Sequence, residues 1–324
     1  MSRVAFIYRT DTHVADKSPA SWKGDYPSEI WSNLEQIGGF ARKYEVTAVL
    51  DGGDYFHVKA SSRNSHSLVI KSAEIQNGYP CDTYCVEGNH DIKYNNLGTI
   101  EEQPLGVLYE SGVFKQLRDV VFESGGIQVR VVGMPYDPNR SLEDLRAIQK
   151  QEGDTYLVAV VHALAGENPP ASVEQFFGEP VFKYADLASE NGPDVWAFGH
   201  WHKDQGIVEF AGKQFVNQGA VSRGALTHEN TQRTPQVSLI EADANGIRTK
   251  LLPLVVAPPE DVFDLERKER AEQESLNITK FVSRLQEVTV DPDAEIEENI
   301  QKLDFDVEVR STALEYLERA SEEI

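Results

Sequence analysis

Two kinds of segment alternate along the first 250 residues, and this alternation constrains the fold more than any other feature of the chain. Short runs rich in β-branched and aromatic residues, such as VAFIYR (4–9), are typical of buried strands. The stretch PSEIWSNLEQIGGFARKY (27–44) has apolar residues at helical spacing, and Ser28 is its candidate N-cap. The same alternation continues through the segments 46–54, 65–76 and 82–91. This βαβαβ order predicts a mostly parallel sheet covered by helices.

The second part of this region predicts a further sheet. Strands are expected at 126–136, 155–163 and 194–202, and a β meander from 207 to 255. We therefore predict an α/β fold, with two β-sheets packed face to face as a sandwich and helices on the outer faces. In sheets of this kind, ligands bind beyond the carboxyl ends of the strands.

The composition changes at VVAPPED (255–261), where two prolines mark a linker or an edge. We predict a catalytic domain over 1–255 and an acidic, mostly helical C-terminal region over 256–324. From Pro258 to the end there are 20 acidic and 8 basic residues, so this segment carries −12 of the net charge of −22. It is either a solvated helical face, or a small ordered domain or partner-docking segment, and the apolar spacing over 281–288 favours an ordered domain.

Hydropathy and net charge exclude some classes of protein. No apolar run approaches the roughly 18–20 residues that a membrane helix needs, and the N-terminus lacks the pattern of a secretory signal, so a cytoplasmic protein without a membrane partner is predicted. The net charge of −22 argues against a broad basic surface for nucleic acid. It agrees with a protein that gathers divalent cations.

Metal-capable side chains stand at the ends of five predicted strands. Each alone is weak, because a lone histidine at a strand end is more often a hydrogen-bonded structural residue. The G-H-x-H pair is stronger, because residues two apart on an extended segment point the same way. Together they form a set at the edge where such sheets place their active sites. The set is Asp11, His13, Asp54, Asn89, His90, Asp91, His162, His200 and His202.

The order D-x-H, G-D, G-N-H-D, a lone H and G-H-x-H resembles the motif order of the calcineurin-like metallophosphoesterases. The motifs span residues 11 to 202, and about 250 residues look like that catalytic domain. The resemblance implies the four-layer α/β/β/α metallophosphoesterase fold and two divalent metal ions. Mixed carboxylate and imidazole ligands suit manganese or iron, with magnesium or zinc as further options. A hydroxide held by the metals would hydrolyse a phosphoester.

The resemblance also implies a role for each position. Asp54 would bridge the two metals, and Gly88 would leave room for the backbone beside them. His90 would face the phosphate, as a proton donor or as a stabiliser of charge, and Asp91 would orient His90. The remaining ligands would divide into Asp11, His13 and His202 on one metal, and Asn89, His162 and His200 on the other.

One segment points to a branch of this family. GDYFH followed by VKASSR resembles the corresponding stretch of DNA-repair nucleases of the SbcD type, called meiotic recombination eleven in eukaryotes. In that branch the histidine at the position of His57 is associated with handling the DNA end, and Ser62 and Arg63 could contact the phosphate backbone. A structural His57 and a solvated Arg63 are the plainer alternatives. The chain departs from the family before the first motif, where Ser or Ala is usual and this sequence has Arg9 and Thr10.

The sequence therefore predicts a manganese-dependent DNA exonuclease or endonuclease of repair, recombination or replication, in a phage or bacterial version with a short tail. In the resembled branch the partner is an SMC-like coiled-coil ATPase of the SbcC type, and a homodimer is also compatible. The alternative is a small-molecule or cyclic-nucleotide phosphodiesterase or phosphatase on the same site. A binding module on an inactive enzyme fold is a third hypothesis, disfavoured because every ligand position is filled.

Overall fold

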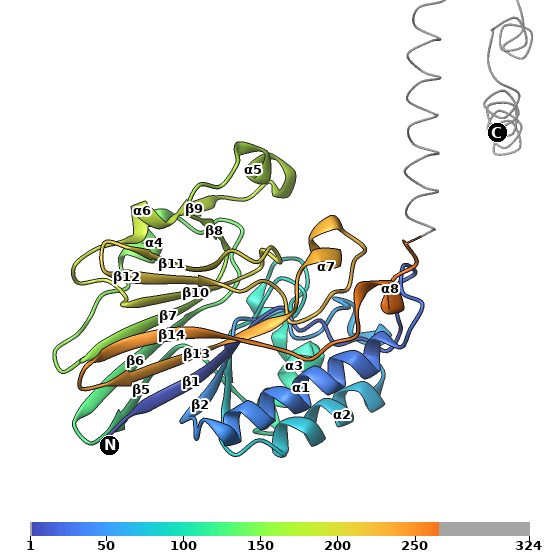
Figure 1. Cartoon of the computed structure of the whole chain (residues 1–324), viewed down its shortest axis with the longest axis horizontal. Helices are drawn as coiled ribbons and strands as arrows, with labels where there is room; N and C mark the ends of the chain where they lie inside the picture. The colour runs from blue at the N-terminus through green and yellow to red at the C-terminus, as the bar shows by residue number, and fades with distance from the viewer. Residues whose placement is uncertain (1, 266–324) are drawn as a thin grey trace, which may run out of the picture. The chain divides into compact units, whose positions relative to one another are not determined.

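A computed structural model describes residues 2–265, and these form two six-stranded sheets with helices on the outer sides (Figure 1). The strand order is β14-β13-β1-β2-β3-β4 in the first sheet and β11-β12-β10-β7-β6-β5 in the second. The strands of the first sheet are β1 (Val4–Arg9), β2 (Ala48–Asp51), β3 (Thr83–Cys85), β4 (Phe114–Gln116), β13 (Gln236–Asp243) and β14 (Gly246–Pro253). Those of the second are β5 (Asp119–Ser124), β6 (Ile127–Met134), β7 (Tyr156–His162), β10 (Val195–Gly199), β11 (Gly206–Phe210) and β12 (Lys213–Asn217). The predicted two-sheet α/β sandwich is confirmed.

Both sheets are mixed, with parallel pairs at their centres. Strands β1, β2, β3 and β4 run parallel, while β13 and β14 complete the first sheet as antiparallel neighbours. In the second sheet β6, β7, β10 and β12 run parallel, and the edge strands β5 and β11 are antiparallel. A small third sheet pairs β8 (Leu164–Gly166) with β9 (Val181–Lys183).

The layer between the two sheets is an apolar core. Its fully buried side chains include Phe6 of β1, Leu50 of β2 and Val160 of β7. A second core lies on the other face of the second sheet, where Trp196 of β10 packs beside Phe215 of β12. A strand that is buried on both faces has a continuous run of apolar residues. This is why β1 and β7 could be predicted as strands from the sequence.

The helices lie outside the two sheets, and the longest of them buries Ile30, Leu34 and Ile37. The longer ones, α1 (Tyr26–Lys43) and α2 (His66–Asn77), lie on the side of the first sheet, and α4 (Leu142–Arg146) and α6 (Tyr184–Leu187) lie on the side of the second (Figure 1). The others are α3 (Pro104–Glu110), α5 (Ala171–Phe177), α7 (His228–Gln232) and α8 (Pro259–Val262), with 3₁₀ turns η1 (Ser61–Arg63) and η2 (Leu97–Glu102).

The first helix begins earlier than the sequence pattern suggested. Its N-cap is Asp25, whose carboxylate accepts from the Ser28 backbone N–H at 3.2 Å and from the Ser28 hydroxyl at 2.6 Å. The prediction of Ser28 as the cap is therefore wrong. Pro27 lies in the first turn, where a missing N–H costs nothing, and this allows the helix to start before it.

The compact unit runs from Met1 to Phe263, so it includes the short helix that begins at the second proline, Pro259. Phe263 pairs with Trp22, and their rings lie 5.5 Å apart. The predicted C-terminal region 256–324, with its apolar spacing over 281–288, lies almost wholly outside the described residues, and it stays a prediction. Among residues 2–265 no helix is long and apolar enough to cross a membrane.

Candidate metal centre

Five strand ends bring their polar residues to one place. Strands β1, β2 and β3 are parallel neighbours in the first sheet, and β7 and β10 are parallel neighbours in the second. Asp11 follows β1, Asp54 follows β2, His162 ends β7 and His200 follows β10. All four side chains are buried, with at most 7% exposed. The fold thus gathers the buried metal-capable side chains that the sequence singled out.

The first cluster contains Asp11, His13, Asp54 and His202, whose ligand atoms all lie within 4.8 Å of one another. The Nε2 atoms of His13 and His202 are 2.9 Å apart, and His202 Nε2 is 3.4 Å from Asp11 Oδ1. Burial lowers the pKa of His13, which keeps its imidazole neutral and its lone pair available. Two carboxylates and two imidazoles are a suitable donor set for a divalent transition metal.

The second cluster contains Asp54, His162 and His200. His162 Nε2 lies 3.6 Å from Asp54 Oδ1, and its Nδ1 faces the backbone oxygen of Gly52 at 2.6 Å. With Nδ1 as the donor in that bond, Nε2 carries the lone pair that faces the cluster. Asp54 belongs to both clusters, so one carboxylate can serve two ions.

The Asn89 amide lies between the second cluster and Lys59. Its side-chain oxygen lies 3.1 Å from Asp54 Oδ2 and 3.1 Å from His200 Nδ1. In this orientation the amide oxygen, the carboxylate oxygen and the imidazole nitrogen are all donor atoms that a divalent ion can accept. Rotating the amide would turn its NH₂ group toward these acceptors and its oxygen toward Lys59, which suits the metal-free protein instead. The donor set therefore fits two divalent ions, one at each cluster.

The loop after β3 packs tightly against the shared carboxylate. The His90 backbone N–H donates to Asp54 Oδ1 at 2.7 Å. A Cβ atom on Gly88 would lie 2.1 Å from the same oxygen, so only glycine fits at this position. The structure therefore confirms the predicted close approach of the Gly88 backbone to the metal centre.

Within residues 2–265 no hydrogen bond joins the Asp91 carboxylate to the His90 side chain, so the prediction that it orients His90 directly is wrong. Its buried carboxylate accepts from three backbone N–H groups, those of Gly88, Tyr55 and Phe56, at 3.0 to 3.3 Å. Those bonds tie the loop after β3 to the loop after β2. His90 is held instead by the His57 backbone oxygen, 2.6 Å from its Nδ1.

His57 lies beside the clusters, as its segment suggested. Its ring stacks on that of His90, with centroids 5.6 Å apart and an interplanar angle of 19°, and it lies 5.4 Å from the ring of His13. Its side chain is exposed. Ser62 and Arg63 are also exposed, on η1, and neither belongs to a cluster.

Three residues near the clusters were missed from the sequence. Lys59 Nζ lies 3.1 Å from the amide nitrogen of Asn89, and Glu179 Oε2 lies 3.0 Å from His200 Nε2. Tyr136 donates its hydroxyl to Glu179 Oε1 at 2.5 Å. Lys59 lies within the segment compared with the nucleases and could have been found there. Glu179 and Tyr136 lie outside every motif, so the sequence carried no signal for them.

Arg9, the departure from the family pattern, has a structural role. It is fully buried, and its Nε donates to Asp51 Oδ2 at 2.7 Å. Asp51 Oδ1 in turn accepts from the Gly53 backbone N–H at 3.0 Å, in the turn that leads to Asp54. The rings of Tyr55 and other aromatic residues surround the guanidinium. Arg9 therefore supports the turn that carries the shared ligand.

Four ligand positions have a left-handed backbone although none is glycine. The φ angles are 52° at Asp11, 52° at His13, 54° at Asp54 and 86° at His200. This conformation costs a residue with a side chain roughly 1–2 kcal/mol. Such outliers collect at functional sites, where the surrounding structure imposes them.

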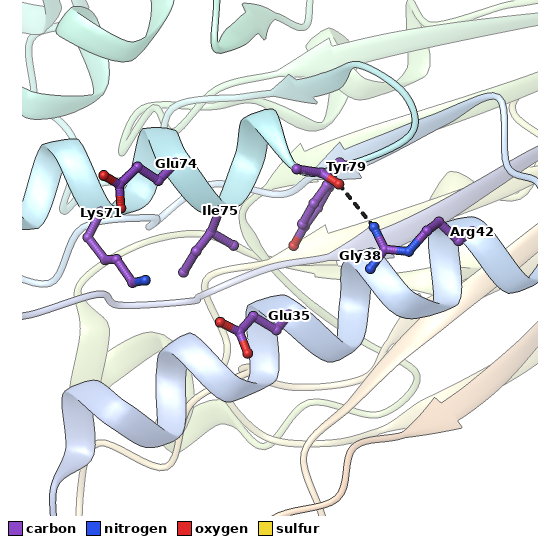
Figure 2. A pocket seen from close by; sticks show the side chains of 8 residues that line it. Glu35, Gly38, Arg42, Lys71, Glu74, Ile75 and Tyr79 are labelled. Atoms are coloured by element: carbon purple, nitrogen blue, oxygen red, sulfur yellow. Dashed lines mark hydrogen bonds between the residues drawn. The ribbon is translucent and has the colours of Figure 1, made fainter.

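A surface pocket of about 280 Å³ lies elsewhere, between α1 and α2 (Figure 2). It is lined by charged side chains of both signs, including Glu35, Arg42 and Lys71, and by Tyr79. Arg42 donates to the Gly78 backbone oxygen across it at 3.0 Å. None of the candidate ligands lines this pocket, so it is separate from the metal centre.

Residues 6–204 match the family model described as calcineurin-like phosphoesterase. No curated protein sequence matches the chain. Similar solved structures include purple acid phosphatase PPD1 from yellow lupin, Lupinus luteus (12% identity, TM-score 0.49, 79% of this chain and 53% of that one). This chain therefore spans about half of the lupin protein. Others are a dimetal phosphatase from Danio rerio (11% identity, TM-score 0.49, 78% and 99%) and the protein TT1561 of Thermus thermophilus (13% identity, TM-score 0.42, 77% and 99%).

Proposed function

The chain belongs to the calcineurin-like phosphoesterase family, and we propose that the phosphoester it hydrolyses is the phosphodiester backbone of DNA. Metal-dependent phosphoester hydrolysis follows from the family match over 6–204 and from the two donor clusters. The observation that carries the proposal is the shared position of Asp54, with the His90 ring 4.8 Å from that of His13 in the first cluster. The proposal goes beyond the family in two respects. It names DNA as the substrate and manganese as the first candidate for the metal.

The ligands of the two clusters would hold one divalent ion each. When bound, such ions lower the pKa of a water molecule and clamp the phosphate between them. The chain itself fixes the geometry, because the buried ligands stand on strand ends and Asp91 ties two of the loops together. Preorganised donors of this kind need no rearrangement during the reaction.

His90 is the residue placed to act on the leaving oxygen. Its Nδ1 is 2.6 Å from the His57 backbone oxygen, so this nitrogen carries a proton and donates it to the carbonyl. Nε2 is then an acceptor in the neutral ring and a donor in the imidazolium. In its charged form His90 can hand a proton to the departing alkoxide, or stabilise the charge that develops there.

Lys59 and Asn89 support a phosphate contact next to the second cluster. With the Asn89 oxygen turned toward the metal-facing atoms, its NH₂ group faces the Lys59 ammonium at 3.1 Å. Two donors at this distance cannot bond each other, but both can donate to one acceptor. A non-bridging phosphate oxygen is such an acceptor.

The segment from His57 to Arg63 supports DNA among the possible diesters. It resembles the same stretch of the SbcD-type nucleases, and His57 lies stacked on His90. Lys93, from the loop after β3, donates to the Ser61 hydroxyl at 3.3 Å and adds a cation beside this segment. A row of cations beside the reacting phosphate is what a nucleic-acid backbone requires.

A small-molecule phosphodiesterase or phosphatase is the second candidate, and the charge of the chain favours it. Outside the acidic tail the sequence still carries −10 of the net charge of −22. A polyanion is repelled by such a surface, whereas a small ester is repelled far less. The same metal centre and His90 would act on either substrate.

The deciding experiment supplies the manganese-loaded protein with labelled linear and circular DNA and, separately, with bis(p-nitrophenyl) phosphate, cyclic nucleotides and a phosphomonoester. We expect DNA cleavage that is lost with a chelator and in Asp54→Ala and His90→Ala. Hydrolysis of the small esters with intact DNA would establish the second candidate. Absence of both activities would contradict the proposal of an enzyme.

We also propose that the tail docks an SMC-like coiled-coil ATPase, which the resemblance implies. Because Phe263 packs on Trp22, a deletion should begin after Leu265 rather than at the prolines. Removing 266–324 should abolish co-purification with such an ATPase while bis(p-nitrophenyl) phosphate hydrolysis persists. Undiminished co-purification would contradict the docking role.

A further inference from the structure

We propose that Glu179 and Tyr136 are positioning residues that fix the imidazole of His200 at the second metal site. Glu179 follows α5 in the chain, and its carboxylate lies 3.0 Å from His200 Nε2. The other carboxylate oxygen accepts the Tyr136 hydroxyl at 2.5 Å. Tyrosine, glutamate and histidine therefore form a hydrogen-bonded chain that ends at the metal centre.

The two nitrogens of His200 face different partners, and this makes the contact informative. Nδ1 points to the cluster, where it lies 3.1 Å from the Asn89 side-chain oxygen. Nε2 points away from the cluster to the Glu179 carboxylate, which can only accept. The carboxylate therefore keeps the proton on Nε2 and leaves the Nδ1 lone pair for the ion. A carboxylate in this position also makes the imidazole a stronger ligand.

The second cluster thus holds its two imidazoles in different ways. His162 is fixed by a backbone oxygen, that of Gly52, within the sheet-end loop itself. His200 depends on a side chain supplied by the loop between α5 and β9. A backbone partner cannot be removed by substitution, but Glu179 can, so the contribution of this support is measurable.

Aromatic rings restrict His200 from the remaining sides. The Tyr136 ring lies 5.4 Å from His200, and the Phe177 ring lies 5.6 Å from it. The Tyr136 backbone is itself fixed, because its N–H donates to the backbone oxygen of Glu87 at 2.8 Å. The carboxylate sets the tautomer of His200, and the rings limit its rotation.

This inference rests on the two-metal centre and not on DNA as substrate. Its test therefore uses Mn²⁺ itself as the probe, with bis(p-nitrophenyl) phosphate as a small diester. Full-length protein is stripped with a chelator and titrated with Mn²⁺ by calorimetry. Wild type should show two binding events per chain.

In Glu179→Gln we expect one of the two Mn²⁺ affinities to fall about 10–100-fold, with the other unchanged. Glutamine keeps an acceptor oxygen but loses the charge and can present its NH₂ group to Nε2. Tyr136→Phe should weaken the same event less, because the carboxylate remains. At saturating Mn²⁺ the hydrolysis rate of Glu179→Gln should recover toward that of wild type.

Glu174→Gln is the matched control, since Glu174 is an exposed carboxylate on the neighbouring α5. It should leave both affinities unchanged. The proposal is overturned if Glu179→Gln and Tyr136→Phe both keep two wild-type affinities. It is also overturned if Glu179→Gln weakens both events equally and lowers the thermal midpoint of the metal-free protein, since that pattern marks a general structural role.

Discussion

The floor and the rim of the metal centre are built in opposite ways. The floor consists of Asp11, Asp54, His162 and His200, all buried at strand ends. The rim consists of the segment 57–63 and the α5 loop, where His57, Lys59 and Arg63 are exposed and Phe176 is 83% exposed. The floor is fixed by two sheets and their core, whereas the rim is fixed by a few local bonds. Loops of this kind carry the part of function that varies on a constant scaffold.

The comparison teaches which parts of the function each region decides. Reaction type follows from the floor, because the donor atoms determine what ions can bind. Substrate follows from the rim, because only rim side chains can reach beyond the reacting phosphate. Substitutions in the floor should therefore remove activity toward every ester, and substitutions in the rim should change activity selectively.

The largest effect is expected for Asp54→Ala, because this carboxylate belongs to both clusters. Activity on every substrate should fall by at least about 10³-fold, as one change disturbs both ions. Asp82→Ala, at an exposed carboxylate paired with Lys115, should leave activity unchanged. Rates with bis(p-nitrophenyl) phosphate at saturating Mn²⁺ measure this, and a loss below about 10-fold would break the shared-ligand assignment.

His90 lies between floor and rim, and His90→Gln tests whether it donates a proton to the leaving group. Removing a general acid costs typically about 10²–10⁴-fold, and the cost should appear with poor leaving groups such as the alkoxide of DNA. With p-nitrophenolate, which departs without a proton, the loss should be much smaller. His66→Gln, at an exposed site on α2, is the control. Equal losses on both substrates would exclude the proton-donor role and favour charge stabilisation.

Lys59→Ala addresses the phosphate contact on the rim. We expect KM to rise about 10-fold with kcat little changed, because the lost interaction binds ground state and transition state alike. Lys59→Arg should restore most of the binding, since it keeps the charge. Steady-state kinetics on the preferred diester provide the measurement. A fall in kcat with constant KM would instead place Lys59 in the chemical step.

Arg63→Ala should have the smallest effect and the most selective one. If Arg63 contacts the DNA backbone, the slope of log affinity against log salt should decrease by about 1, with hydrolysis of small esters unaffected. Arg248→Ala, at an exposed arginine on β14, should leave the slope unchanged. Unaltered salt dependence in both variants would make Arg63 a solvated side chain.

The same division decides how much of the molecule the sequence could predict. The strands, the two sheets and the ligand positions were accessible, because parallel strands with polar ends converge by geometry alone. Ser28 was mistaken for the cap because the helix was expected to begin at Pro27, whereas it begins at Tyr26 with Asp25 as its cap. Asp91 was misassigned because its backbone partners become visible only when the loops are packed.

Glu179 could not be predicted from sequence at all. It lies 21 residues before His200 in a loop without a motif, and only the packing of that loop brings the two together. The substrate could not be predicted from the sequence either. The directions of the rim side chains depend on a few tertiary contacts, which the spacing of apolar residues along the chain does not encode. The net charge of −22 favours a small ester over DNA as the substrate, but the charge does not identify the ester.

The left-handed backbone at four ligand positions has a consequence for evolutionary drift. A descendant freed from catalysis would gain stability by losing His13, because glycine relieves this strain by roughly 1 kcal/mol and the buried Nδ1 of His13 has no hydrogen-bond partner. In chelator, His13→Gly should accordingly raise the thermal midpoint above that of the metal-free parent, and a lower midpoint would contradict this. At His13 the metal-binding side chain is therefore retained against the preference of its own backbone for glycine.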